Sequence, residues 1–164
     1  MKIEINPQLF IPLIPFLLGI LFKALLDLNL AIKLVKYFHL MPVRFLFRIK
    51  PIQISGKWTQ LWENNVSQEY KSEESRKSEV IFKQFGKYCY GEYRIKNDEL
   101  YYVFGELKGN HFIGKWGNVN NEFGYFGVFE LYIKDPKNIE GLWIGHSSNN
   151  HQKINLGKWY FKKI

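Results

Sequence analysis

Few residues of this chain have the types and spacing that enzymatic chemistry requires. The histidines show no HExxH spacing, and Cys89 is the only cysteine, so a Cys-x-x-Cys pair is impossible. Ser147 and His151 lie close together, but no Gly-x-Ser-x-Gly sequence places a hydroxyl on an exposed turn. Three glutamates on different predicted strands could still form a carboxylate pair: Glu92, Glu106 and Glu130. We therefore expect a protein that is not an enzyme and holds no metal ion.

Aromatic side chains offer a different chemistry, which is stacking on a planar ligand. They make up 18% of the chain, and a Gly-x-Trp sequence occurs four times, ending at Trp58, Trp116, Trp143 and Trp159. On a β-strand, the glycine and the tryptophan of each motif share one face. A bend at glycine beside an inward indole lets a small barrel turn a corner and fills its interior. The motifs are therefore predicted to be mainly structural, with the alternative that at least one indole stacks on a ligand.

The elements that carry these tryptophans are predicted to be short antiparallel strands. Period-two alternation and turn residues indicate eight of them, approximately Gln53–Trp62, Glu79–Phe85, Lys87–Lys96, Glu99–Leu107, His111–Trp116, Gly124–Lys134, Ile139–His146 and Lys153–Lys163. Such strands stack as a sandwich or close as a meander, and the Gly-x-Trp bends favour closure. We expect an all-β, lipocalin-like barrel at residues 51–164, with the polar stretch 63–78 as a solvated helix or loop.

Residues 1–50 have a different composition and are predicted to anchor the chain to a membrane. Residues 9–32 form a mostly apolar run of about 24 residues, enough to span a bilayer as a helix. Lys23 and Asp27 within it are four residues apart and can pair on one helix face, which lowers the cost of a charge in hydrocarbon. Residues 33–40 alternate apolar and basic positions, as in an interfacial or second short membrane helix. A signal peptide and a soluble helix packed on the barrel are the alternatives.

The charge distribution indicates which surface the chain binds. The net charge is +8; residues 1–50 carry seven basic against two acidic residues, and residues 51–164 carry sixteen against thirteen. Because the excess lies beside the apolar run, a phosphate-bearing lipid surface fits it better than DNA, for which no dense basic helix is present. By the positive-inside rule, the basic flank and the barrel after Pro51 are expected in the cytoplasm. The single cysteine agrees with a reducing compartment.

The order of these segments resembles a known family. A short membrane region is followed by three motifs, Ile54-Ser55-Gly56-Lys57-Trp58, Phe82-Lys83-Gln84-Phe85-Gly86 leading into Gly91-Glu92-Tyr93, and Gly157-Lys158-Trp159-Tyr160-Phe161. Together they resemble the two-transmembrane β-barrel effectors of bacterial cyclic-oligonucleotide anti-phage signalling. The resemblance implies a cytoplasmic barrel that binds a cyclic dinucleotide made by a nucleotide cyclase, and N-terminal helices that assemble and disrupt the inner membrane. The second apolar segment departs from that pattern, because it is short and carries Lys33, Lys36 and His39.

The ligand site is expected at one mouth of the barrel, because an eight-stranded barrel is just wide enough for one small ligand. A cyclic dinucleotide presents two bases that can stack and two phosphates that need donors. The candidates are Trp58, Tyr93, Trp116 and Trp143 for stacking, Gln84 for a base edge, and Arg94, His146 and Asn155 for phosphate or ribose oxygens. We expect a homo-oligomer, with the direction of ligand control left open. The alternative function is a membrane-tethered, lipocalin-like carrier of an apolar ligand.

Overall fold

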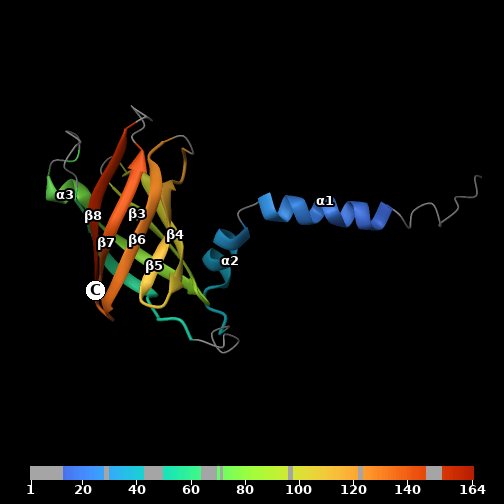
Figure 1. Ribbon diagram of the computed structural model, residues 1–164, viewed down its shortest axis with the longest axis horizontal. Helices are drawn as coiled ribbons and strands as arrows, with labels where there is room; N and C mark the ends of the chain where they lie inside the picture. Colours follow the sequence, from blue (N-terminus) through green and yellow to red (C-terminus); the bar gives the residue numbers. More distant parts are fainter. Residues whose placement is uncertain are drawn as a thin grey trace, which may run out of the picture.

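Eight antiparallel strands form a closed barrel in the computed structural model of this protein (Figure 1). The structure describes residues 13–27, 30–42, 50–63, 70, 72–95, 98–121, 124–146 and 153–164. The strands are β1 Gly56–Trp62, β2 Lys77–Phe85, β3 Tyr88–Arg94, β4 Leu100–Lys108, β5 His111–Asn118, β6 Phe126–Asp135, β7 Asn138–His146 and β8 Ile154–Lys163. Each strand pairs with its neighbours in sequence, and β8 pairs with β1. The predicted eight-stranded meander barrel is confirmed.

The barrel follows from the alternation of side chains along each strand. On β4, Val103 and Leu107 point inward and are buried. On β6, Phe129 and Leu131 do the same, and the alternate residues of both strands face outward. Inward aromatic rings meet across the interior, and the ring centres of Phe82 on β2 and Phe112 on β5 are 5.6 Å apart. Burial of these apolar surfaces drives the strands together, so the core lies inside the barrel.

One end of the barrel is closed by the segment that precedes β1. Ile54 is buried there, its backbone N–H donates to Gln84 Oε1 at 2.9 Å, and its carbonyl accepts from Trp58 Nε1 at 2.8 Å. The Gln84 amide nitrogen donates to the carbonyl oxygens of Ile52 at 2.8 Å and Gly86 at 3.0 Å. The polar groups of this segment are thus satisfied inside the barrel, as buried backbone requires. The other end, where α3 (Glu73–Arg76) lies, is the mouth.

A short helix packs on the outside of the barrel. Helix α2 (Leu30–Phe38) contacts β2 and β3, and its Val35 is buried. Lys36 Nζ lies 2.6 Å from Glu92 Oε1, and the Tyr90 hydroxyl donates to the same carboxylate. Burial raises the pKa of Glu92, but the bonds from Lys36 and Tyr90 outweigh it and hold that pKa below its ordinary value. An ion pair therefore joins α2 to the outward face of β3.

The described part of residues 1–50 forms two helices rather than one long one. Helix α1 (Leu13–Asp27) precedes α2 and lies beyond it, away from the barrel (Figure 1). Its described apolar side chains are exposed, among them Phe16, Leu17 and Leu21. None of the described helices is long and apolar enough to cross a bilayer. Lys23 is exposed, whereas the side chain of Asp27 lies outside the described part of the structure, so their pairing stays a prediction.

Candidate functional site

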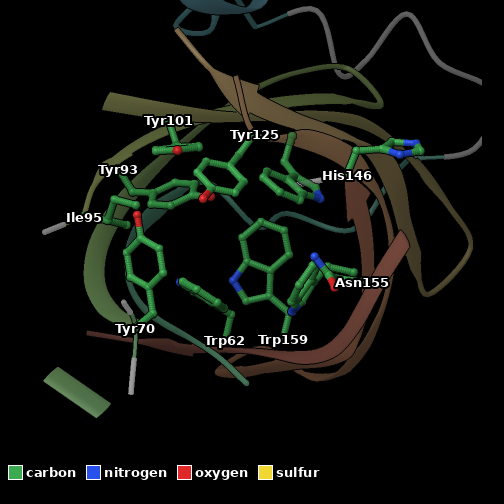
Figure 2. Close-up of a pocket in the computed structure, with 11 residues that line it drawn as sticks. Trp62, Tyr70, Tyr93, Ile95, Tyr101, Tyr125, His146, Asn155 and Trp159 are labelled. Carbon is green, nitrogen blue, oxygen red and sulfur yellow. The ribbon is translucent and has the colours of Figure 1, made fainter. Parts of the chain in front are cut away.

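An aromatic cavity of about 80 Å³ lies inside the barrel at the mouth. It is lined by Trp62, Tyr70, Tyr93, Ile95, Tyr101, Trp116, Tyr125, Trp143, His146, Asn155 and Trp159. Figure 2 shows the labelled aromatic side chains around the barrel interior. The wall lies opposite the end that Ile54 closes, because Ile54 precedes the first residue of β1 and Trp62 is the last. The wall comes from the mouth ends of several strands, so the closed barrel holds its side chains in fixed positions.

The tryptophans of the wall present both faces and edges to the cavity. The Trp143 ring lies edge-on to Trp62 and to Trp116, with ring centres 5.8 Å apart in both pairs. Tyr93 and Tyr101 are stacked with ring centres 5.8 Å apart. These geometries are the ones that aromatic quadrupoles favour. A planar ligand can therefore meet a ring face on one side and ring edges on another.

Glycines on neighbouring strands make room for the two central indoles. Trp116, Gly127, Gly145 and Asn155 follow one another across β5, β6, β7 and β8 in the same register row. A Cβ at Gly145 would lie 2.3 Å from Trp116 Cζ2, so the indole occupies the space that a side chain would fill. The Trp143 indole likewise packs against Gly157, because a Cβ at Gly157 would lie 2.6 Å from Trp143 Nε1. The glycines thus fix where the two indoles lie.

The indole N–H groups of the four Gly-x-Trp motifs fall into two classes. Trp159 Nε1 donates to Gln60 Oε1 at 2.7 Å, and Trp58 Nε1 donates to the Ile54 carbonyl. Trp116 Nε1, Trp143 Nε1 and Asn155 Oδ1 are buried without a hydrogen-bond partner among the described residues. All three of these side chains line the cavity. Buried polar groups are nearly always paired in folded proteins, so these three atoms are exceptions, and they are closed off from water.

The cavity wall is uncharged. Of the described residues that line it, none is an aspartate, glutamate, lysine or arginine. Burial raises the pKa of Tyr93 and of Tyr101 well above the ordinary tyrosine range, so both phenols stay protonated. A buried site of this kind favours the neutral part of a ligand, because an unpaired ion would lose its solvation there.

The structure brings together five of the eight residues expected to bind ligand. Tyr93, Trp116, Trp143, His146 and Asn155 line the cavity. His146 lies at the rim, where its ring points away from the interior (Figure 2) and packs on Phe126 with ring centres 5.3 Å apart. The role of the five in binding stays a prediction.

The other three expected residues lie elsewhere. Trp58 and Gln84 lie at the closed end and bond to the segment beneath the barrel, because their polar atoms satisfy its backbone. Arg94 is on the outer face, where its guanidinium pairs with Asp98 at 2.9 Å. None of these three side chains lines the cavity.

The sequence did not predict six of the residues that line the cavity: Trp62, Tyr70, Ile95, Tyr101, Tyr125 and Trp159. The signal for Tyr101 was present, since it is an inward position one residue into a strand that begins at the mouth. Tyr70 lies in the polar insertion and carried no periodic signal. The wall is therefore defined by strand ends, which the alternation pattern alone does not mark.

Comparison with known proteins does not indicate a function for this chain. No known family profile and no curated protein matches the chain. A solved structure of a redesigned β-barrel, mFAP1, bound to DFHBI, is similar with a TM-score of 0.43 and 10% sequence identity, over 65% of this chain and 93% of that chain. The function must therefore be argued from the cavity itself.

Proposed function

We propose that this protein is an anti-phage effector in which the barrel binds a cyclic dinucleotide at the aromatic mouth and controls assembly of the N-terminal helices at the bacterial inner membrane. The observation that carries the proposal is the cavity, whose wall combines aromatic side chains with polar ones, the tyrosines and Asn155. Nucleobases use both, because they stack on aromatic rings and present acceptors and donors at their edges.

The size of the cavity limits how such a ligand would enter. Sites that enclose a drug-sized molecule are roughly 300–1,000 Å³, whereas this cavity is about 80 Å³. One ring system fits, and the remaining base and both phosphates would stay at the mouth. Arg76 lies there, since its Nη1 donates to the Trp62 carbonyl at 3.4 Å, and Arg94 ends β3 on the same side. These cations are the proposed partners of the phosphates.

The test is thermal stability and calorimetry of the full chain against cyclic di-AMP, cyclic di-GMP and cyclic di-UMP. One of them should raise the melting temperature by mass action. Trp143→Ala should then weaken binding by about 5- to 150-fold, the value of roughly 1–3 kcal/mol for one stacked base. Tyr132→Ala, an exposed aromatic on the outer face, is the matched control and should bind normally. No shift with any cyclic dinucleotide, and a shift with a fatty acid, would establish the apolar carrier instead.

The proposed link between ligand and membrane is strand β3. Tyr93 on this strand faces the cavity, and its neighbour Glu92 faces outward to the Lys36 side chain of α2. A ligand that displaces the Tyr93 ring would move the backbone that carries Glu92. Helix α2 in turn contacts α1, whose exposed apolar side chains are the proposed membrane-active surface.

The proposed homo-oligomer would form through the outer face of β6, β7 and β8. That face exposes large apolar side chains near the mouth: Phe126, Val128, Leu142, Ile144, Ile154 and Leu156. Leu142 lies in register between Glu130 on β6 and Lys158 on β8. A two-fold axis parallel to β7 would stack Leu142 on its own copy and place each Glu130 opposite the other copy's Lys158. The face is thus self-complementary in charge, as an isologous interface requires.

A further inference from the structure

Lysines surround the closed end of the barrel. The three hairpins that turn at this end carry Lys87, Lys108 and Lys137, and β8 ends there at Lys163, beside the C-terminus marked in Figure 1. Among the described residues of these turns and strand ends, Asp135 has the only acidic side chain, and it accepts hydrogen bonds within its own turn. The described lysines of this end, called the lysine ring below, are Lys50, Lys57, Lys87, Lys108, Lys134, Lys137, Lys162 and Lys163.

Neighbouring carboxylates cancel only part of this charge. Glu106 lies 2.9 Å from the Lys87 ammonium and 2.7 Å from that of Lys108, so two lysines share one carboxylate. Lys57 and Lys134 each pair with one glutamate farther along the barrel wall. Even when these three glutamates and the aspartate are counted, the lysines outnumber the acidic side chains. The closed end therefore keeps a positive charge.

The mouth has no such excess. Its described strand ends and turns carry acidic and basic side chains in similar numbers: Glu63, Glu73, Glu74, Asp98 and Glu99 against Arg76, Lys77, Arg94 and Lys153. The described charge of the barrel is thus asymmetric along its axis, and the positive end is the one opposite the cavity.

The lysine ring is built for an extended partner rather than a small ligand. The buried side chain of Ile54 and the segment around it fill this end, and the cavity lies at the other. The lysines are spread over three hairpins and the end of β8, so one small anion cannot contact them all. A spread of positive charge without a pocket suits an array of negative charges.

Exposed apolar side chains lie on the same side of the molecule as part of the ring. Helix α2 packs on β2 and β3, the hairpin that turns at Lys87. The exposed side chains at the end of α2 and just after it are Tyr37, Phe38, Leu40 and Met41. Lysines beside such side chains are typical of a surface that rests on a bilayer, because the ammonium groups meet lipid phosphates while the apolar groups enter the interface.

Nucleic acid is the other extended polyanion, and the ring fits it less well. Arginine is the residue that most often reads bases and grips phosphates in two places at once. No arginine belongs to the described part of the closed end. The ring offers point charges alone, which a layer of lipid headgroups satisfies.

We propose that the lysine ring is a docking surface for an anionic bilayer, so that the barrel stands with its closed end on the lipid headgroups and its mouth toward the solvent. Each lysine near such a surface contributes roughly 1 kcal/mol, so several together hold the barrel upright. The inference rests on the membrane location in the proposed function but not on the identity of the ligand. Upright barrels keep the cavity open to the solvent and set the β6–β8 faces of neighbouring copies side by side.

The experiment measures which end of the barrel is nearer the lipid. The full chain is placed in nanodiscs of phosphatidylcholine alone, or of equal parts phosphatidylcholine and phosphatidylglycerol, with a gadolinium chelate on a few lipid headgroups. Paramagnetic relaxation is read at the backbone amides of Gly109 and Asp98, which flank the two ends of β4. Those ends are roughly 25 Å apart for a nine-residue strand, and the relaxation falls with the sixth power of distance.

In anionic nanodiscs, the relaxation at Gly109 should exceed that at Asp98 by about tenfold or more, as the length of β4 requires. The excess should shrink in neutral nanodiscs, and in anionic ones at about 1 M salt, where the Debye length is roughly 3 Å. Replacing two ring lysines together, Lys108→Glu with Lys137→Glu, should remove it. The matched control is Lys77→Glu with Lys153→Glu, the same change of charge at exposed positions of the mouth, which should preserve it.

The outcomes separate this inference from the proposed function. A chain that binds nanodiscs with equal relaxation at both amides overturns the docking surface and leaves the membrane effector standing. So does an excess that is the same in neutral and anionic lipid, or one that the control variant loses as fully as the ring variant. Equal relaxation together with duplex RNA binding that only the ring variant loses would make nucleic acid the partner instead. A chain that binds neither kind of nanodisc overturns both the docking surface and the membrane location.

Discussion

The closed end of the barrel gives the sharpest quantitative prediction. Gln84 was expected to meet a ligand, but the structure surrounds it with the segment before β1, where it makes three hydrogen bonds of 2.8 to 3.0 Å. Gln84→Met keeps the shape of the side chain and removes all three bonds. At about 1 kcal/mol net for each bond, the free energy of unfolding should fall by about 3 kcal/mol, and by more if the backbone groups of Ile52 and Ile54 stay buried.

The assay is chemical and thermal denaturation of the full chain, with ligand affinity measured on the folded variant. A loss of about 3 kcal/mol corresponds to a melting temperature lower by roughly 6–12 °C for a chain of this size. Gln53→Met is the matched control, because Gln53 is exposed in the same segment and its replacement should change stability by less than about 0.5 kcal/mol.

Affinity for the ligand should stay within about threefold of the original, since Gln84 lies at the end opposite the cavity. A Gln84→Met variant that keeps its stability and loses ligand would refute this assignment. Gln84 would then be a ligand-binding residue, as the sequence predicted.

Three further predictions follow from the outer surface. Leu17→Lys on the exposed face of α1 should abolish dye leakage from anionic vesicles while ligand binding persists; leakage at the original rate would exclude α1 as the membrane-active surface. Ile144→Glu should convert an oligomer to a monomer in light scattering, because it places a charge at the centre of the β6–β8 face; an unchanged mass would exclude that interface. The pKa of Glu92 in the folded protein is lower than its ordinary value, which is about 4.3 in an unfolded chain. The bond from Lys36 to Glu92 therefore stabilises the packing of α2 on the barrel above that ordinary pKa, and this stabilisation is lost as pH falls through the lower pKa of the folded protein. Nuclear Overhauser contacts between Lys36 and the Tyr90 ring should disappear in acid, and in Glu92→Gln they should be weak at every pH.

The strands were predictable because each has one buried and one exposed face, and the alternation that results is local. The first strand ends at Trp62 as predicted but begins at Gly56 rather than Gln53, for a physical reason. Ile52 and Ile54 alternate with polar residues as a strand does, but Gly56 has a φ of +122°, and the chain turns there to cross the closed end. The apolar residues of that segment are buried against the core without joining the sheet. The alternation of apolar and polar residues before Gly56 therefore reflects burial against the core rather than strand pairing.

The site was harder to predict because pairing across the barrel decides which aromatic side chains are structural. Trp159 is satisfied by Gln60, which is 99 residues away in the chain. Trp143, with the same Gly-x-Trp sequence, faces the cavity. The motif places an indole inside the barrel, and only the closed geometry determines whether an acceptor meets it.

The direction of ligand control can be read from the ion pair between α2 and β3 without observing the membrane. Glu92 and Tyr93 are neighbours on β3, so one strand carries both the ion pair with α2 and part of the cavity wall. If ligand favours release of α2, then weakening the ion pair must raise affinity, because coupling between two equilibria is reciprocal. Glu92→Gln should therefore bind the cyclic dinucleotide more tightly if ligand frees the N-terminal helices, and less tightly if ligand holds them on the barrel. Equal affinity would mean that β3 does not connect the cavity to α2.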